Sequence, residues 1–472
     1  MKHYTRNLFI VDLNVRMLAR VAVIRTANEH RGGKVTRKAL CGRRWSCLIA
    51  VIVGVSLAGC GQSGDGGGSV DSSKSVSATQ AHRAGIWVRF PPVNAPLTAL
   101  ATLGKRIFFD PSLSESGKLA CASCHDPDHA YAPPNALAVQ MGGRDMHQAG
   151  LRAVPSLRYM GYTPKYTSHY AVPTPDGIDD EGATGGYPRD GAVDSLHQQA
   201  LMPLLNPREM ANRDVTAIAA KLRKAPYADQ LVRMFGADIF ERPNDAVAQS
   251  ALAIEAFETE GANFQPYTSK FDAVMAGNAR FSDDEQRGFV LFHDPNKGNC
   301  AKCHVDSPGP GGRPAQFTDF GFDAIGVPRN PEIPANLDPR YFDLGLCRSS
   351  RPSTMNRHAQ CGMFKTPTLR NVASRRAFFH NGRFHTLAEV LHFYVERDSD
   401  PSKWYRNGDG KLVPYDDLPA PYRENVDRIN APFRKQSVGQ PILNDDEIAD
   451  LIAFLKTLDD GYSVQAGGAR PN

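Results

Sequence analysis

Apolar residues recur with helical spacing in several parts of the chain. Four of them, in the segment 448–455, lie at positions i, i+3, i+4 and i+7, which places them on one helix face; they are Ile448, Leu451, Ile452 and Leu455. Asn444 is a favourable N-cap for this helix, and acidic residues follow in its first turn. The segment 247–257 has helical spacing too. Strand-like alternation is scarce, and 34 prolines with 41 glycines indicate long loops, so a mainly α fold is predicted.

A short apolar run near the N-terminus predicts an export signal. Residues 48–57 (LIAVIVGVSL) follow Arg43 and Arg44 and are too few to span a bilayer. The run ends in Leu57-Ala-Gly-Cys60, which resembles a bacterial lipobox. We therefore expect residues 1–60 to be a lipoprotein signal peptide, with Cys60 as the lipidated anchor of a periplasmic protein. An ordinary signal peptide with a chance cysteine is the alternative.

Charge and composition separate this leader from the remainder. Residues 1–59 hold eleven Lys or Arg but only Asp12 and Glu29, so the formal net charge of +5 leaves the other residues at about −4. A nucleic-acid partner would require a basic face, so none is expected. Residues 61–82 are rich in Gly and Ser, which predicts a flexible linker.

The chain contains an internal repeat. Residues 104–111 (GKRIFFDP) and 288–295 (GFVLFHDP) have Gly, Phe, Asp and Pro at identical offsets. Each copy leads through a turn into a CxxCH motif. Two copies of one unit predict two tandem cytochrome-c-like domains with long loops, over residues 83–265 and 266–472, each holding one c-type haem.

In a CxxCH motif the two cysteines share one helix face. They can form thioethers to the vinyl groups of a haem while the histidine presents its ring to the iron. A single CxxC motif also suits zinc or redox chemistry, but two copies behind a repeated lead-in favour two covalent haem c groups. The residues concerned are Cys121, Cys124 and His125 in the first motif and Cys300, Cys303 and His304 in the second.

Two cysteines belong neither to the leader nor to the CxxCH motifs. Cys347 and Cys361 lie fourteen residues apart in a stretch that reads as a loop. An oxidising compartment favours a disulfide between them, and two free buried thiols are the alternative.

Several segments resemble the bacterial di-haem cytochrome c peroxidase/MauG superfamily. They occur in the expected order and span roughly residues 95–460: 104–111 with the first haem motif, 199–210, 364–372, 379–382 and 386–390. In that superfamily the second haem has a distal Met in peroxidases and a Tyr in MauG-type enzymes. The matching residue here is Tyr394, for which helix packing is the alternative role. A phenolate ligand stabilises oxidised iron relative to a thioether.

The resemblance also implies a peroxide pocket at the first haem. By that match Glu209 is the acid/base that moves a proton between the peroxide oxygens, and Gln199 and Pro203 line the pocket. Peroxidase members have a distal histidine that must leave this iron. The nearest candidate, His147, does not fit the spacing and is expected to be a loop residue, so an open first haem is predicted.

Other positions depart from the family pattern. Arg189 stands where a tryptophan usually lies between the haems, and Tyr187 is the nearest redox-active side chain in sequence. The positions expected to bind an interdomain calcium read Ala153, Arg375 and Ala377, so we expect no calcium there. Arg375 and Arg376 could instead neutralise haem propionates. Residues 159–187 look like an insertion that covers a haem or the cleft, or is a surface excursion.

The resemblance implies a peroxidase. Hydrogen peroxide would be reduced at the first haem, with electrons entering through the second from a small redox protein, either a c-type cytochrome or a cupredoxin. The alternative is a MauG-like oxidase that uses a high-valent di-haem state to oxidise Tyr or Trp of a partner protein. A pure electron carrier would need both irons tightly six-coordinate, which the pocket implied at Glu209 argues against.

Overall fold

The computed structural model describes residues 95–174, 177–180, 182–309, 312–355, 357–406, 409–433 and 441–463. The predicted signal peptide, Cys60 and the linker lie outside these residues. The chain divides into two compact units, Met1–Ile86 and Trp87–Asn472, and every feature below belongs to the second. Within the described ranges no helix is long and apolar enough to cross a membrane.

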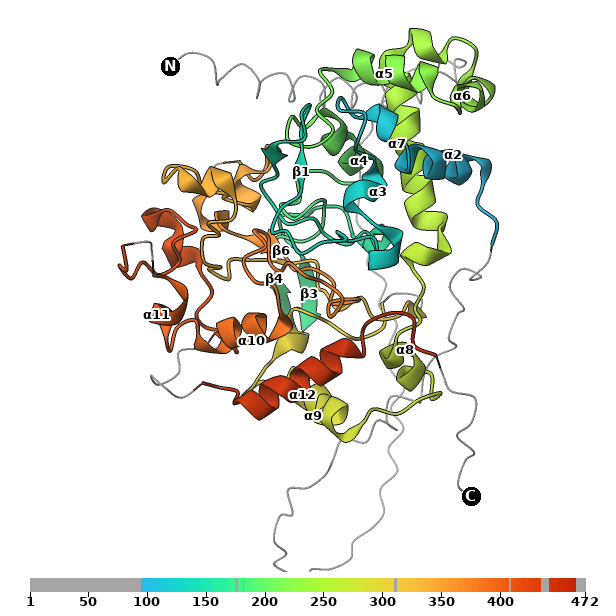
Figure 1. Cartoon of the computed structure of the whole chain (residues 1–472). Coiled ribbons are helices and arrows are strands. Elements are labelled where there is room, and N and C mark those ends of the chain that lie inside the picture. Colours follow the sequence, from blue (N-terminus) through green and yellow to red (C-terminus); the bar gives the residue numbers. More distant parts are fainter. Residues whose placement is uncertain are drawn as a thin grey trace, which may run out of the picture. The chain divides into compact units, whose positions relative to one another are not determined.

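Helices dominate the described residues, as predicted (Figure 1). The helices are α2 (Ala99–Phe108), α3 (Cys121–Cys124), α4 (Leu196–Leu205), α5 (Val215–Lys224), α6 (Ala228–Phe235), α7 (Pro243–Glu260), α8 (Lys270–Met275), α9 (Asp283–His293), α10 (Leu387–Glu396), α11 (Pro401–Trp404) and α12 (Asp445–Lys456). Short strands form three antiparallel pairs: β1 (Met141–Gly142) with β2 (Gln148–Ala149), β3 (Ala171–Thr174) with β4 (Gly177–Asp180), and β5 (Phe322–Asp323) with β6 (Phe364–Lys365).

The predicted C-terminal helix is confirmed as α12. Asn444 caps it by accepting a hydrogen bond from the backbone N–H of Glu447, whose side chain bonds back to the cap. Of the predicted apolar face, Ile452 is only partly buried, whereas Phe454 is fully buried. Phe454 lies among the rings of α9, with its centroid 5.1 Å from that of Phe292. The buried face is therefore wider than the spacing predicted. The helix expected at 247–257 is also present, inside the longer α7.

The glycines of the internal repeat lie where helices cross. α2 packs beside α7, and α9 packs beside α12 (Figure 1). A Cβ atom on Gly104 would lie 1.7 Å from the carbonyl oxygen of Ala253, and one on Gly288 would lie 2.0 Å from that of Asp450. The repeat is thus two helix pairs whose backbones touch, which only glycine permits.

Each helix pair is surrounded by its own cluster of buried residues. One cluster runs from Leu103 to Phe264 and the other from Phe271 to Leu458. The repeated phenylalanines have equivalent places, because Phe108 contacts the ring of Tyr131 (centroids 6.0 Å apart) and Phe292 that of Phe317 (6.3 Å). The domain boundary at 265/266 stays a prediction.

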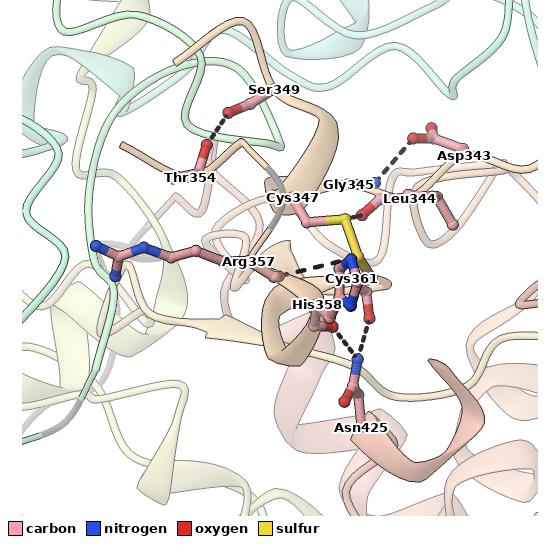
Figure 2. The surroundings of a disulfide bond; sticks show 10 residues. All are labelled: Asp343, Leu344, Gly345, Cys347, Ser349, Thr354, Arg357, His358, Cys361 and Asn425. Atoms are coloured by element: carbon pink, nitrogen blue, oxygen red, sulfur yellow. Dashed lines mark hydrogen bonds between the residues drawn. A yellow bond between two sulfur atoms is a disulfide. The ribbon is translucent and has the colours of Figure 1, made fainter. Parts of the chain in front are cut away.

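The disulfide between Cys347 and Cys361 is confirmed (Figure 2). Both cysteines are buried, and the side chain of Asn425 donates hydrogen bonds to the carbonyls of His358 and Cys361. The loop that the disulfide closes also reaches the first half of the chain, where Arg351 donates to the carbonyl of Gly191. The disulfide therefore holds a loop that braces the segment following Arg189.

Replacing either crossing glycine should destabilise the protein. Gly104→Ala and Gly288→Ala would place a methyl group against a backbone carbonyl, and overpacking of this kind typically costs about 1–3 kcal/mol. Gly161→Ala is the matched control, since its Cβ would meet nothing closer than 3.4 Å. Denaturant unfolding measures the free energies. Crossing variants as stable as Gly161→Ala would show that the backbones do not meet there.

Candidate functional site

The second CxxCH motif begins with a single turn of 3-10 helix, Cys300–Lys302, and continues through Cys303 to His304. Neither cysteine is in a disulfide. Desolvation raises the pKa of both Cys300 and Cys303 to about 12. Two unpaired thiols three residues apart, followed directly by a histidine, could form the two thioethers of a haem c.

His304 is prepared to bind a metal through one ring nitrogen. Its Nδ1 lies 3.0 Å from the backbone carbonyl of Phe317, which can only accept a hydrogen bond, so Nδ1 carries the proton. Desolvation lowers the pKa of His304 to about 4, which keeps the ring neutral. The free lone pair therefore lies on Nε2, as an iron ligand requires.

The first motif repeats this arrangement on α3. The Nδ1 of His125 lies 3.1 Å from the carbonyl of Tyr131, and desolvation lowers the pKa of His125 to about 4. Desolvation also raises the pKa of Cys121 to about 12 and that of Cys124 to about 11, and the charge of Glu209 adds to both shifts. The carboxyl group predicted for the first pocket therefore lies close to the first motif.

Helix α4 carries the other two residues predicted for this pocket. Ser195 caps the helix, and Gln199 and Pro203 lie four residues apart on one face. Pro203 has no N–H, so it leaves the carbonyl of Gln199 without its helical donor. No side-chain hydrogen bond of Gln199 exists among the described residues. Both side chains are half-buried.

Glu209 is held just beyond α4. Its backbone N–H donates to the carbonyl of Asn206, and its carbonyl accepts from Gly143. The Asn206 amide donates to its carboxylate at 2.7 Å. The Glu209 side chain is exposed. Desolvation by its neighbours nevertheless raises its pKa, opposed by the Asn206 hydrogen bond.

One cavity brings together all four residues predicted for the second haem. Cys300, Cys303, His304 and Tyr394 line it, in a largely apolar wall. Tyr394 lies on α10, whose N-terminus is closed by a capping box of Thr386 and Glu389. Its ring stacks on Phe433 with centroids 5.0 Å apart.

The polar end of Tyr394 is left without a protein partner. In the part of the chain that the structure describes, its hydroxyl makes no hydrogen bond. Desolvation raises the pKa of Tyr394, with smaller contributions from Cys300 and Cys303. A ring held by packing with a free hydroxyl in the cavity fits a ligand better than a packing residue. Met160 also lines this cavity, which no motif predicted.

Three of the cations that line the same cavity donate to backbone carbonyls. Arg189 donates to the carbonyl of Ala153 at 3.2 Å, Arg375 to those of Val154 (2.9 Å) and Ala377 (3.3 Å), and Lys365 to that of Gly186. In each case the hydrogen-bond acceptor is a backbone carbonyl rather than a carboxylate.

Among the described residues none of these three cations forms an ion pair, although the Asp190 carboxylate partly offsets the desolvation of Lys365. Desolvation lowers the pKa of Arg189 to about 9, of Arg375 to about 10 and of Lys365 to about 7. Desolvated cations are costly unless an anion joins them, and the two propionates of a haem are suitable anions. The residues present therefore fit a haem. Arg376, expected to share this task, is exposed and donates to the carbonyl of Pro134 instead.

Two other residues singled out in the sequence, His147 and Tyr187, do not line this cavity. His147 is exposed between β1 and β2 and lines a different cavity with Arg208 and Glu332. Its lack of an iron-binding role stays a prediction. The hydroxyl of Tyr187 donates to the carbonyl of Met160 at 2.7 Å.

Some residues of the site were missed by the sequence reasoning. Lys365 and Arg152 stand inside or beside segments that matched the family, but nothing in their spacing marks them as desolvated. Arg152 pairs with Asp190 (2.7 Å) and Asp343 (2.5 Å). Glu258 on α7 is buried with one unpartnered oxygen, and desolvation raises its pKa to about 8. A carboxylate on the buried face of a predicted helix was the available signal for Glu258.

Comparison with known proteins identifies the family. Residues 98–280 match the family model for di-haem cytochrome c peroxidase. The chain is 35% identical over 370 residues to the methylamine utilization protein MauG of Paracoccus denitrificans, which covers 77% of this chain and 89% of that protein. It is 28% identical over 306 residues to the cytochrome c551 peroxidase of Nitrosomonas europaea, covering 64% and 73%.

A solved structure of a di-haem peroxidase has a similar fold. The crystal structure of the diheme peroxidase BthA from Burkholderia thailandensis superimposes with a TM-score of 0.69 at 37% identity, over 80% of this chain and 91% of that one. Both MauG and peroxidase names occur among the relatives, so the family covers both activities. The chain therefore belongs to the di-haem cytochrome c peroxidase family of haem-dependent oxidoreductases.

Proposed function

We propose that this chain is a periplasmic di-haem c-type peroxidase. It reduces hydrogen peroxide at a first haem and receives electrons through a second haem from a small redox protein, a c-type cytochrome or a cupredoxin. The observation that carries the proposal is that the surroundings of the two CxxCH motifs differ. Glu209, with its raised pKa, lies near the first motif, whereas Tyr394 shares a cavity with the second.

Each haem is assigned to one half of the chain. In residues 83–265 Cys121 and Cys124 form the thioethers and His125 binds the iron; in residues 266–472 Cys300, Cys303, His304 and Tyr394 hold the second haem. The two separate clusters of buried residues support this division. When bound, the haem irons supply the redox chemistry. The disulfide supports an oxidising compartment, and a lipid anchor at Cys60 would tether the protein to a membrane.

The protein side chains transfer a proton between the two oxygens of hydrogen peroxide. The Glu209 carboxylate accepts a proton from one oxygen of hydrogen peroxide and returns it to the other oxygen, which leaves as water. The Asn206 amide holds the carboxylate in place. Gln199 and Pro203 restrict the pocket so that peroxide is presented to Glu209 rather than to bulk water.

No calcium is needed between the halves in this proposal. The Arg375 guanidinium already donates to the carbonyl of Ala377, and Arg189 to that of Ala153, which are two of the positions where the family's calcium would bind. A divalent cation there would also be repelled by the two guanidinium groups.

A MauG-like oxidase is the second candidate. Tyr394 and the 35% identity to a MauG protein favour it. In that role the two haems would share the oxidising equivalents of one peroxide and take electrons from Tyr or Trp residues of a partner protein. Arg189, in the place of the usual tryptophan, weakens the usual route for sharing charge.

Replacing Glu209 tests the peroxidase directly. Glu209→Gln should lower peroxide turnover with a reduced c-type cytochrome by about 100-fold to 10,000-fold, because the amide cannot accept the proton. In the wild type kcat/KM should rise with pH through a pKa above that of an ordinary glutamate, since the raised pKa delays formation of the carboxylate. Glu241→Gln, whose side chain is 72% exposed, is the control. An unchanged rate in Glu209→Gln would refute this role.

Replacing Tyr394 tests the second pocket. Tyr394→Met should raise the reduction potential of one haem by on the order of 100 mV, within the roughly 0.8 V that axial ligands span. It should also shorten the lifetime of the oxidised haem state that forms with one equivalent of peroxide. Tyr405→Phe, a buried tyrosine that bonds the carbonyl of Gly326, is the control. An unchanged potential would mean that Tyr394 only packs and would direct attention to Met160.

A persistent oxidised state without turnover of the reduced cytochrome would favour the MauG-like role. Rapid turnover would favour the peroxidase. If peroxide produced neither, both candidate functions would fail.

A further inference from the structure

A row of aromatic side chains, interrupted by one backbone hydrogen bond and one arginine, lies between the two CxxCH motifs on their histidine sides. His125 bonds the carbonyl of Tyr131, and His304 bonds that of Phe317. Between these two residues lie Tyr159 and Tyr267, whose ring centroids are 4.9 Å apart. The position between the haems where the family has a tryptophan holds Arg189, which is not redox-active, so another route is required if charge is to pass.

Contacts extend the tyrosine pair towards both motifs. On the first side, the ring of Tyr131 stacks on Phe264 with centroids 3.8 Å apart, and the carbonyl of Phe264 accepts from the N–H of Tyr159 at 2.8 Å. On the second side, the Arg370 guanidinium lies 4.8 Å from the ring of Tyr159 and 4.7 Å from that of Tyr267. Arg370 lines the Tyr394 cavity and is itself buried.

Tyr159 has a partner that can take its proton. Its hydroxyl donates to the carboxylate of Asp460, at 2.8 Å and 3.0 Å from the two oxygens, and accepts from the N–H of Tyr267. The Asp460 side chain is only 3% exposed. A phenol loses its proton when it is oxidised, so a carboxylate within hydrogen-bond reach makes oxidation possible inside a protein. Desolvation and Asp460 hold the pKa of Tyr159 well above its usual range, so the phenol is protonated beforehand.

Four of the aromatic residues between the motifs have strained backbones. Tyr131, Tyr159, Tyr267 and Phe317 all have left-handed backbones, with φ of 54°, 65°, 48° and 53°. Such conformations are unfavourable for large side chains and tend to gather at functional sites. Phe264, which stacks on Tyr131, lies in a 3-10 helix instead.

Resting on the proposed peroxide chemistry, we propose that Tyr159 is a redox-active tyrosine that carries an electron between the two haem sites, with Asp460 as its proton acceptor and the Tyr267 ring as a bridge. Tyr159 gives one electron to the first haem site after hydrogen peroxide has oxidised the haem there, and its O–H bond breaks as the proton moves to Asp460. A neutral tyrosyl radical remains on Tyr159. An electron from the second haem site tunnels across the Tyr267 ring, which keeps its own proton, and reduces the radical as the proton returns from Asp460.

Other tyrosines provide matched controls. Tyr187 is buried beside the cavity, but its hydroxyl donates to a backbone carbonyl, which does not accept a proton at neutral pH. Tyr415 donates to the carboxylate of Asp398 and contacts the ring of Tyr405, but the pair lies within the second cluster of buried residues. Neither arrangement joins the two motifs.

The test is electron paramagnetic resonance on the full-length holoprotein, frozen within milliseconds of mixing with hydrogen peroxide. Optical spectra are recorded in parallel. The wild type should give a radical whose hyperfine splitting changes when the protein contains deuterated tyrosine. Tyr159→Phe and Asp460→Asn should lose this radical, whereas Tyr187→Phe and Tyr415→Phe should retain it. Thermal unfolding checks that each variant is folded, and Asp460→Asn keeps a polar partner for Tyr159.

Each outcome decides the proposal. The relay is supported if Tyr159→Phe and Asp460→Asn lose the radical, the two control variants keep it, and all four still show the change in haem absorption with peroxide. A radical that survives in Tyr159→Phe, or disappears only in Tyr187→Phe or Tyr415→Phe, overturns it. If peroxide changes the haem absorption of the wild type but no tyrosyl radical forms, the relay is overturned and the proposed peroxidase function is unaffected. No optical change with peroxide overturns both.

Discussion

Desolvated positive charge without an ion-pair partner among the described residues is the constraint on which the rest of this site depends. Arg189, Lys365 and Arg375 face one cavity and donate only to backbone carbonyls. Placing such cations away from bulk water is costly until an anion arrives. Haem propionates supply that anion in our account, so the pocket and its cofactor depend on each other. Arg152, by contrast, is neutralised within the protein, because it pairs with the carboxylates of Asp190 and Asp343.

The internal repeat provides two similar frames for two different pockets. In each frame a glycine lets two helices touch, and a backbone carbonyl fixes the Nδ1 of the motif histidine. The differences come from outside the repeat. Glu209 belongs to a turn after α4, and Tyr394 belongs to α10. The duplicated scaffold thus sets the positions of the histidines, whereas in the proposed function Glu209 and Tyr394, from segments outside the repeat, give the two haems different chemistry.

Local features could be predicted from the sequence and long-range ones could not. The capped helix α12, α7 and the disulfide follow from short-range spacing, and the structure confirms them. The resemblance to the family predicts Tyr394 as a ligand of the second haem, and in the structure Tyr394 lines one cavity with the second motif. The ion pair between Arg152 and Asp343 joins residues 191 positions apart, and no local pattern marks either partner. The same holds for the contact of Tyr159 with Asp460.

The most direct test of the account is metal analysis of the purified holoprotein, because the proposal replaces the family's calcium with the guanidinium groups of Arg189 and Arg375, which donate to the carbonyls of Ala153 and Ala377. We predict no stoichiometric calcium, and haem spectra that neither a chelator nor added calcium changes. Stoichiometric calcium whose removal alters the haem spectra would contradict the account. It would show that a metal ion, rather than these arginines, organises the region between the two haems.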